Sequence, residues 1–66
     1  MKNTLKVERA KLNLTQQDLA YKVSVSRQTI NSIEADRYVP STVLAIKISN
    51  VFKCTVNEIF KIENDD

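Results

Sequence analysis

The sequence predicts an all-α fold, a single small domain of five short helices. Serine or threonine stands at positions 15, 26, 41 and 55, and after each the apolar residues recur at intervals of three and four, the spacing of a one-sided helix. The chain has 66 residues. On folding, a chain of this length buries only about 60% of the surface that it exposes when unfolded. We therefore expect one domain over residues 1–66, for which a second copy is a natural source of extra stability.

The first two of these caps predict a pair of closely joined helices. Thr15 is a good N-cap, and Asp18 three residues later makes a near variant of the capping box. A two-residue turn then leads to Ser26, which caps a helix over about residues 27–35. Two helices joined in this way form a helix-turn-helix layout over about residues 16–35.

The second helix of the pair carries a distinctive polar face. With Ile30 turned inward, the helical period places Gln28 and Ser32 on the opposite side, Asn31 on the flank and Arg27 at the first position. Arginine can bind guanine through two hydrogen bonds, and glutamine or asparagine can bind adenine in the same way. Serine can contact several base edges. The face is therefore suited to reading DNA, although it could equally be ordinary polar surface.

The remaining caps predict the end of the domain. The third cap begins a helix over about residues 42–52, and Thr55 with Glu58 forms a full capping box for a short fifth helix. Beyond it, apolar and polar residues alternate over 60–63, which permits a short strand. Residues 1–5 are its one plausible partner, so a two-stranded terminal β-ribbon is expected.

Several classes of protein are excluded by composition. The chain has no histidine and one cysteine, Cys54, so neither a zinc site nor an internal disulfide is expected. It has no glycine-rich phosphate loop and no two acidic residues paired in an apolar setting. We therefore predict no enzyme activity, no cofactor and no small-molecule ligand. No signal peptide or membrane-length apolar run is present, which predicts a cytoplasmic protein without a membrane partner.

The charges are unevenly distributed along the chain. Residues 1–57 hold nine lysines and arginines against four acids, whereas residues 58–66 hold one lysine against four acids. The basic part could attract DNA over a distance. The acidic end is expected to be a frayed, solubilising tail.

Several motifs together resemble one known family. They are the segment LTQQDLA, the segment SRQTIN after the short turn, the pair Ile33 and Glu34, Pro40 ahead of a further helix, and the closing segment VNEIF. These resemble the Xre/Cro-type helix-turn-helix family of phage repressors and small bacterial transcriptional regulators. The resemblance extends from Leu5 to Phe60 and implies a lambda-repressor-like fold that binds double-stranded DNA.

The resemblance also implies roles for individual residues. Its base-edge contacts fall on Arg27, Gln28, Asn31 and Ser32, with Asn31 also among its phosphate contacts. The other phosphate contacts fall at the start of the first helix of the pair, at the start of the second and in the loop that follows: Thr15, Gln16, Thr29, Arg37, Tyr38 and Ser41. The family pattern further pairs Arg9 with Glu34 in a structural ion pair.

The chain departs from the family pattern because it contains no glycine. Where the family usually has glycine, this chain has Asn13, Ser24, Asp36 and Lys53. Asparagine and aspartate tolerate a left-handed backbone, whereas serine and lysine each incur a cost of about 1 kcal/mol or change the turn. Glu8 also stands where the family usually buries an aliphatic residue.

A dimer surface is expected late in the chain, at about residues 51–62. Apolar residues there cannot all face inward on such short helices, so part of them should form an exposed patch, with Val51, Val56, Ile59 and Ile62 as the interface. A two-fold dimer would place two recognition helices about 34 Å apart on a palindrome. The sequence thus favours a homodimeric transcriptional repressor. The alternative is a protein-binding module on the same fold, such as an antitoxin or coactivator, and a regulatory protein partner also remains open.

Overall fold

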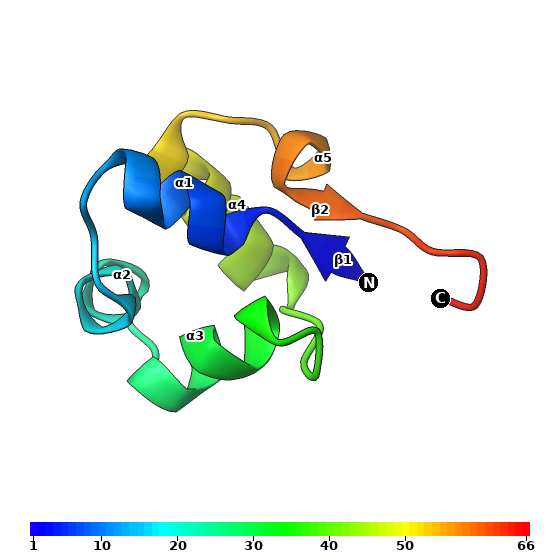
Figure 1. The fold of residues 1–66 in the computed structure, drawn as a ribbon, viewed down its shortest axis with the longest axis horizontal. Helices are drawn as coiled ribbons and strands as arrows, with labels where there is room; N and C mark the ends of the chain where they lie inside the picture. Colours follow the sequence, from blue (N-terminus) through cyan, green and yellow to red (C-terminus); the bar gives the residue numbers. More distant parts are fainter.

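The computed structural model describes residues 1–66, which form five helices and a small antiparallel sheet (Figure 1). This is the expected five-helix fold with a terminal ribbon. In chain order the elements are β1 (Lys2–Asn3), α1 (Leu5–Lys11), α2 (Gln16–Val23), α3 (Arg27–Glu34), α4 (Thr42–Phe52), α5 (Val56–Ile59) and β2 (Phe60–Lys61). No helix combines the length and the apolar character needed to cross a membrane.

The four predicted caps begin four of these helices. In each, the side-chain oxygen of the cap accepts a hydrogen bond from the backbone N–H three residues later, which satisfies one of the free donors of the first turn. Asp18 and Glu58 complete capping boxes by accepting from the N–H groups of Thr15 and Thr55. The helix predicted over 27–35 ends one residue earlier, and Ala35 is its C-cap.

One apolar core holds the helices together. It contains residues from α1 to α5 and the first residue of β2: Leu5, Leu19, Ala20, Val23, Ile30, Ile33, Leu44, Ala45, Ile48, Ile59 and Phe60. α3 is attached to it by Ile30 and Ile33, both buried on one side of the helix. The polar face of α3 is thereby directed away from the core.

The turns without glycine all keep the left-handed backbone. Asn13, Ser24, Asp36 and Lys53 have φ between 54° and 62°. In each turn, the residue after the left-handed one donates its N–H to the carbonyl five residues earlier, as in a Schellman motif. The donor and acceptor pairs are Leu14 with Arg9, Val25 with Ala20, Arg37 with Ser32, and Cys54 with Ser49. The chain thus retains the geometry usual for glycine in all four turns.

The two ends of the chain meet in the β-ribbon. Lys2 lies opposite Lys61 and Asn3 lies opposite Phe60 in antiparallel register. The N–H of Thr4 adds a hydrogen bond to the Ile59 carbonyl, at an N···O distance of 2.9 Å. The predicted pairing of the N-terminal residues with a strand after the fifth helix is therefore confirmed.

The predicted exposed patch needs one correction. Ile59 is fully buried, because the short α5 turns this side chain into the core, so it offers no surface to a partner. Val51 and Val56 are half-buried against the core, whereas Ile62 is 84% exposed. Glu8, at the position where the family usually buries an aliphatic residue, is half-buried and bonds to Lys11 and to the Cys54 thiol.

Candidate nucleic-acid interface

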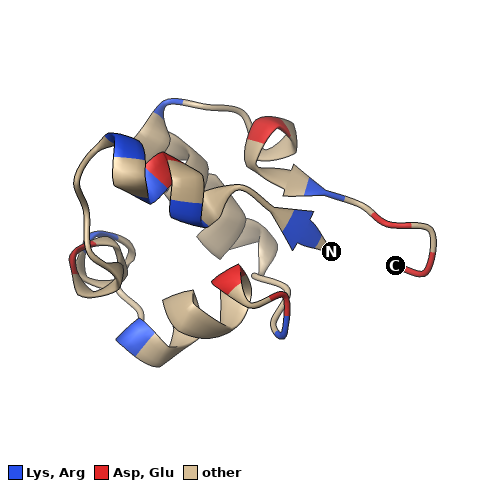
Figure 2. Ribbon diagram, viewed as in Figure 1, with Lys and Arg blue, Asp and Glu red and all other residues tan.

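The outer face of α3 displays the residues that the sequence singled out. Arg27, Gln28 and Asn31 are exposed and Ser32 is half-buried. Their exposure follows from the helix period, because Ile30 and Ile33 occupy the inward side. Apart from Glu34 at its last position, α3 carries no acidic residue (Figure 2). An anionic ligand could therefore approach most of this helix without meeting a negative side chain.

Gln16, at the start of α2, ties two of these side chains together. Its Oε1 accepts hydrogen bonds from Arg27 Nη1 and Asn31 Nδ2, both at 3.4 Å. Asn31 Oδ1 in turn accepts from Arg37 Nη2, at 3.2 Å, in the loop after α3. The first residue of α2, the exposed face of α3 and the following loop thus share one hydrogen-bond network.

This network is anchored on a largely buried ion pair. Arg9 donates to Glu34 through two parallel bonds, Nε to Oε2 at 2.6 Å and Nη2 to Oε1 at 2.9 Å, and Nη1 donates to the Leu14 carbonyl. The side chains of Arg9 and Glu34 are only 13% and 7% exposed. The pair joins α1 to the last turn of α3, as the resemblance implied, and the bidentate geometry fixes the orientation of both groups.

Glu34 is held in its charged form. Burial alone would raise the pKa of this carboxyl, but the hydrogen bonds from Arg9 and Gln16 outweigh that effect and keep the pKa below its usual range. Gln16 Nε2 donates to Glu34 Oε1 at 3.1 Å, so this bond fixes which way the amide of Gln16 points. Its oxygen is left to face Arg27 and Asn31.

Two adjacent hollows lie beside the exposed face of α3. The first, of about 320 Å³, is lined by Gln28, Thr29, Ser32, Arg37 and Tyr38. The second, of about 280 Å³, shares Thr29 and Tyr38 and adds residues from the turn before α3 and from α4, including Ser41 and Lys47. The structure therefore brings Thr29 of α3 together with Tyr38 and Ser41 of the loop that leads into α4.

Thr15 has a local role as well. Its hydroxyl oxygen accepts from the Asp18 N–H and its own N–H donates to the Asp18 carboxylate, so both groups take part in the capping box of α2. These hydrogen bonds lower the pKa of Asp18. The position of Thr15 at the N-terminus of α2 places it beside Gln16.

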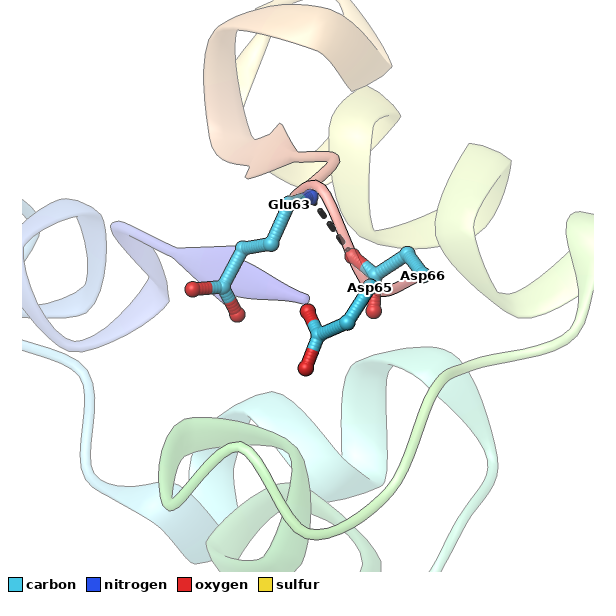
Figure 3. A group of neighbouring side chains, drawn as sticks. All are labelled: Glu63, Asp65 and Asp66. Carbon is cyan, nitrogen blue, oxygen red and sulfur yellow. Dashed lines mark hydrogen bonds between the residues drawn. The ribbon is translucent and has the colours of Figure 1, made fainter.

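The acidic tail does not have the frayed form that the sequence suggested. Glu63, Asp65 and Asp66 gather their carboxylate oxygens within 4.8 Å of one another (Figure 3). The amine of Met1 lies among them, 3.1 Å from Asp66 Oδ1 and 3.3 Å from Glu63 Oε1. This amine is a cation supplied by the chain itself, and it explains why the tail folds back.

This architecture is that of a known protein family. A family model described as helix-turn-helix matches residues 5–59. The chain belongs to the helix-turn-helix family. The matched range contains all five helices of this helix-turn-helix protein and the polar residues Arg27, Gln28, Asn31 and Ser32 of α3.

Curated relatives match this helix-turn-helix protein over their whole length. It is 53% identical to an uncharacterised HTH-type transcriptional regulator, MJ0272, of Methanocaldococcus jannaschii, with all of both chains covered. It is 39% identical to the uncharacterised HTH-type transcriptional regulator YgzD of Bacillus subtilis, again with all of both chains covered. The chain is thus a helix-turn-helix regulator of the DNA-binding class.

A solved structure shows the same fold. The clp gene regulator ClgR of Corynebacterium glutamicum matches with a TM-score of 0.75 and 24% identity, over 82% of this chain and 57% of the ClgR chain. The likeness supports the lambda-repressor-like arrangement expected for the helix-turn-helix protein.

Sequence reasoning left two features of the helix-turn-helix protein unassigned. Asn3 donates to the Ile33 carbonyl at the end of α3, and the Met1 amine binds the acidic tail. An N-terminal polar residue gives no periodic signal, and the charge of a terminal amine is not visible in the residue letters. Lys47, for which the sequence predicted no role, lines the second hollow.

Proposed function

We propose that this protein is a sequence-specific transcriptional repressor that binds a palindromic DNA operator as a homodimer, with α3 in the major groove. The observation that carries the proposal is the network joining Gln16, Arg27, Asn31 and Arg37, which displays hydrogen-bonding side chains on one face. A protein of this kind works where genomic DNA lies, in the cytoplasm of a bacterium or archaeon. Its task is binding rather than catalysis.

The base contacts are assigned to α3. Arg27, near the N-terminus of the helix, suits the O6 and N7 atoms of guanine, and Gln28 suits the N6 and N7 atoms of adenine. Ser32 lies one turn further on and can meet several base edges. Asn31 lies at the flank, where it can contact a base or continue the chain of hydrogen bonds to Arg37.

The phosphate contacts are assigned to the rim around α3. Thr15 and Gln16 lie at the N-terminus of α2, where free N–H groups and the helix dipole favour an anion. Arg37 and Tyr38 border the first hollow, and the second adds Ser41 at the N-terminus of α4. Thr29 lies between the two hollows. These groups would set the position of α3 on the duplex without reading sequence.

The homodimer is assigned to the surface formed by α4, α5 and β2. Val51, Val56 and Ile62 remain the interface candidates after Ile59 is removed. A groove of about 220 Å³ on this side is lined mainly by apolar residues, among them Val39, Ile46 and Val56. Val39 and Ile46 are themselves exposed, and an apolar groove lined by exposed apolar side chains is the kind of surface that a second copy can cover across a two-fold axis. Repression is favoured because a domain of this size has little surface with which to recruit polymerase.

Selection from random duplex DNA at physiological salt, followed by sequencing of the retained molecules, tests the proposal. We expect a palindromic motif whose half-site centres lie about one helical turn apart. Retention without any motif would contradict sequence-specific binding and indicate a nonspecific binder. No retention would contradict DNA binding and favour the protein-binding alternative, for which the apolar groove at Val39 and Ile46 is the natural site.

A further inference from the structure

The N-terminal strand makes a specific contact with the end of α3. Asn3 Nδ2 donates to the Ile33 carbonyl at 2.8 Å and to Asp36 Oδ1 at 3.1 Å. Lys2 Nζ lies 3.2 Å from Asp36 Oδ2, so both carboxylate oxygens of Asp36 are bonded to β1. These contacts join residues about thirty positions apart in the chain.

Both acceptors of Asn3 lie where α3 passes into its loop. Ile33 carries one of the last carbonyls of α3, which accepts the Asp36 N–H at 3.0 Å, so Asn3 is the second donor to this oxygen. Asp36 is the left-handed residue that ends the turn, and Arg37 and Tyr38 follow it directly. Asn3 therefore bonds to both sides of the junction between the reading helix and the phosphate-contacting loop.

The strand is itself held firmly on its other side. Asn3 is paired with Phe60 of β2, and the Thr4 N–H bonds to the Ile59 carbonyl. The Met1 amine is bound by Glu63 and Asp66. In the fold, β1 lies between β2 and the end of α3 (Figure 1). A contact from Asn3 thus connects the C-terminal segments of the chain to the end of the reading helix.

We propose that Asn3 is a positioning residue for DNA recognition, which holds the end of α3 and the Arg37–Tyr38 loop in one fixed relation to the terminal ribbon. The inference rests on the proposed DNA-binding function. Since Ile62 of the candidate dimer surface follows β2 directly, the same contact sets the orientation of α3 relative to the partner copy. Asn3 touches no DNA in this role; it acts through α3 and the loop.

A purely local role for Asn3 must be separated from this one. Its Oδ1 accepts a hydrogen bond from the Leu5 N–H at 3.1 Å, which helps to begin α1. Asn3→Asp keeps this acceptor but cannot donate to Ile33, and it sets a carboxylate against Asp36. Asn3→Ser is a neutral variant that also keeps an acceptor near the Leu5 N–H and is too short to reach Ile33.

The experiment measures the affinity of wild type, Asn3→Asp and Asn3→Ser for the selected operator and for an unrelated duplex, by fluorescence anisotropy at a temperature where thermal denaturation shows each to be folded. For both variants we expect the ratio of operator to unrelated-duplex affinity to fall about tenfold, the effect of losing one good hydrogen bond. Tolerance of altered half-site spacing should increase. Asn50→Asp, an exposed change of the same charge on α4, should leave the ratio unchanged.

The outcomes distinguish this inference from the proposed function. If wild type retains no motif, DNA recognition itself fails and Asn3 has nothing to position. If wild type selects its operator and the folded Asn3→Asp and Asn3→Ser variants keep the same affinity ratio and spacing preference, the positioning role is overturned. Should Asn3→Asp fail to fold, the neutral Asn3→Ser variant decides between the two results.

Discussion

Gln16 has a central place beside the proposed DNA-reading face, which consists of Arg27, Gln28, Asn31 and Ser32 on α3. Its amide nitrogen bonds to Glu34 and its amide oxygen to Arg27 and Asn31, so one side chain links the buried ion pair to the exposed surface. Side chains that are held before a ligand arrives lose less conformational entropy when they bind it. The face is therefore preorganised for contact along its Arg27 and Asn31 side.

The proposed division of labour predicts different effects for two residues. Gln28→Ala should lose discrimination at one or two base positions, by about 1 to 3 kcal/mol per good contact. Arg37→Ala should weaken binding to all sequences alike and reduce the dependence of affinity on salt. Titrations of both variants against operators with single base changes, at several salt concentrations, measure both effects. Unchanged affinity and base preference in Gln28→Ala would contradict the assigned face.

The ion pair makes a prediction about stability. Glu34→Gln leaves Arg9 largely buried without its charge partner, and should lower the free energy of unfolding by about 3 kcal/mol. Urea denaturation measures this loss, with the exposed change Asp65→Asn as control.

The pH dependence of that loss follows from Glu34. Hydrogen bonds keep the pKa of Glu34 low in the folded protein. They therefore stabilise the fold at any pH above the ordinary pKa of a glutamate, and this contribution is lost as the pH falls through the pKa of Glu34 in the folded protein. The difference between wild type and Glu34→Gln should therefore shrink in acid. A difference that is the same at neutral and acidic pH would show that the charge of Glu34 is not its source.

At the scale of the elements, the helix ends carry the clearest energetic cost. Ser24 and Lys53 hold a left-handed backbone that costs residues with a Cβ about 1 to 2 kcal/mol. Because glycine adopts this conformation freely but loses more entropy on folding, Lys53→Gly should stabilise the protein by about 0.5 to 1 kcal/mol. Denaturant unfolding tests this, with Lys53→Ala as the control that removes the charge but keeps the strain. Equal stability of the two variants would mean that the turn is unstrained.

Most elements could be predicted because local signals define them. The caps at Thr15 and Thr55 and the turn residue Asn13 act on their own neighbours, so their effect is visible in the sequence. The prediction that Ile59 lies at the surface was wrong, because the direction of this side chain depends on how the four residues of α5 pack against the core. The contact of Asn3 with Ile33 spans thirty residues and has no local signal.

At the scale of the whole molecule, the closed termini make the fold sensitive to alkali. The hydrogen bond to Asp66 raises the pKa of the Met1 amine, so this contribution to stability is present below about pH 8 and is lost as the pH rises through the folded value. Thermal denaturation of wild type and Asp66→Asn should differ at pH 7, and the difference should shrink as the pH rises and the amine loses its proton. A difference that stays the same in alkali would mean that the amine does not contribute.

Assembly is the second property of the whole molecule. Ile62→Asp should convert the proposed dimer into a monomer that keeps its fold, because the side chain is 84% exposed in the single chain. Sedimentation velocity measures the oligomeric state. Tyr21→Asp is a matched control, since Tyr21 is equally exposed but lies on α2. A monomeric wild type, or a dimeric Ile62→Asp variant, would contradict the assigned surface.

The meeting of the first and last residues also bears on how the protein can be engineered. An N-terminal affinity tag would turn the Met1 amine into an uncharged amide and separate the tail from its cation. Head-to-tail cyclisation through a short linker would instead join the two ends covalently with little rearrangement, because the side chain of Asp66, through Oδ1, already lies 3.1 Å from that amine. A circular form of the regulator should keep its operator specificity and resist exopeptidases.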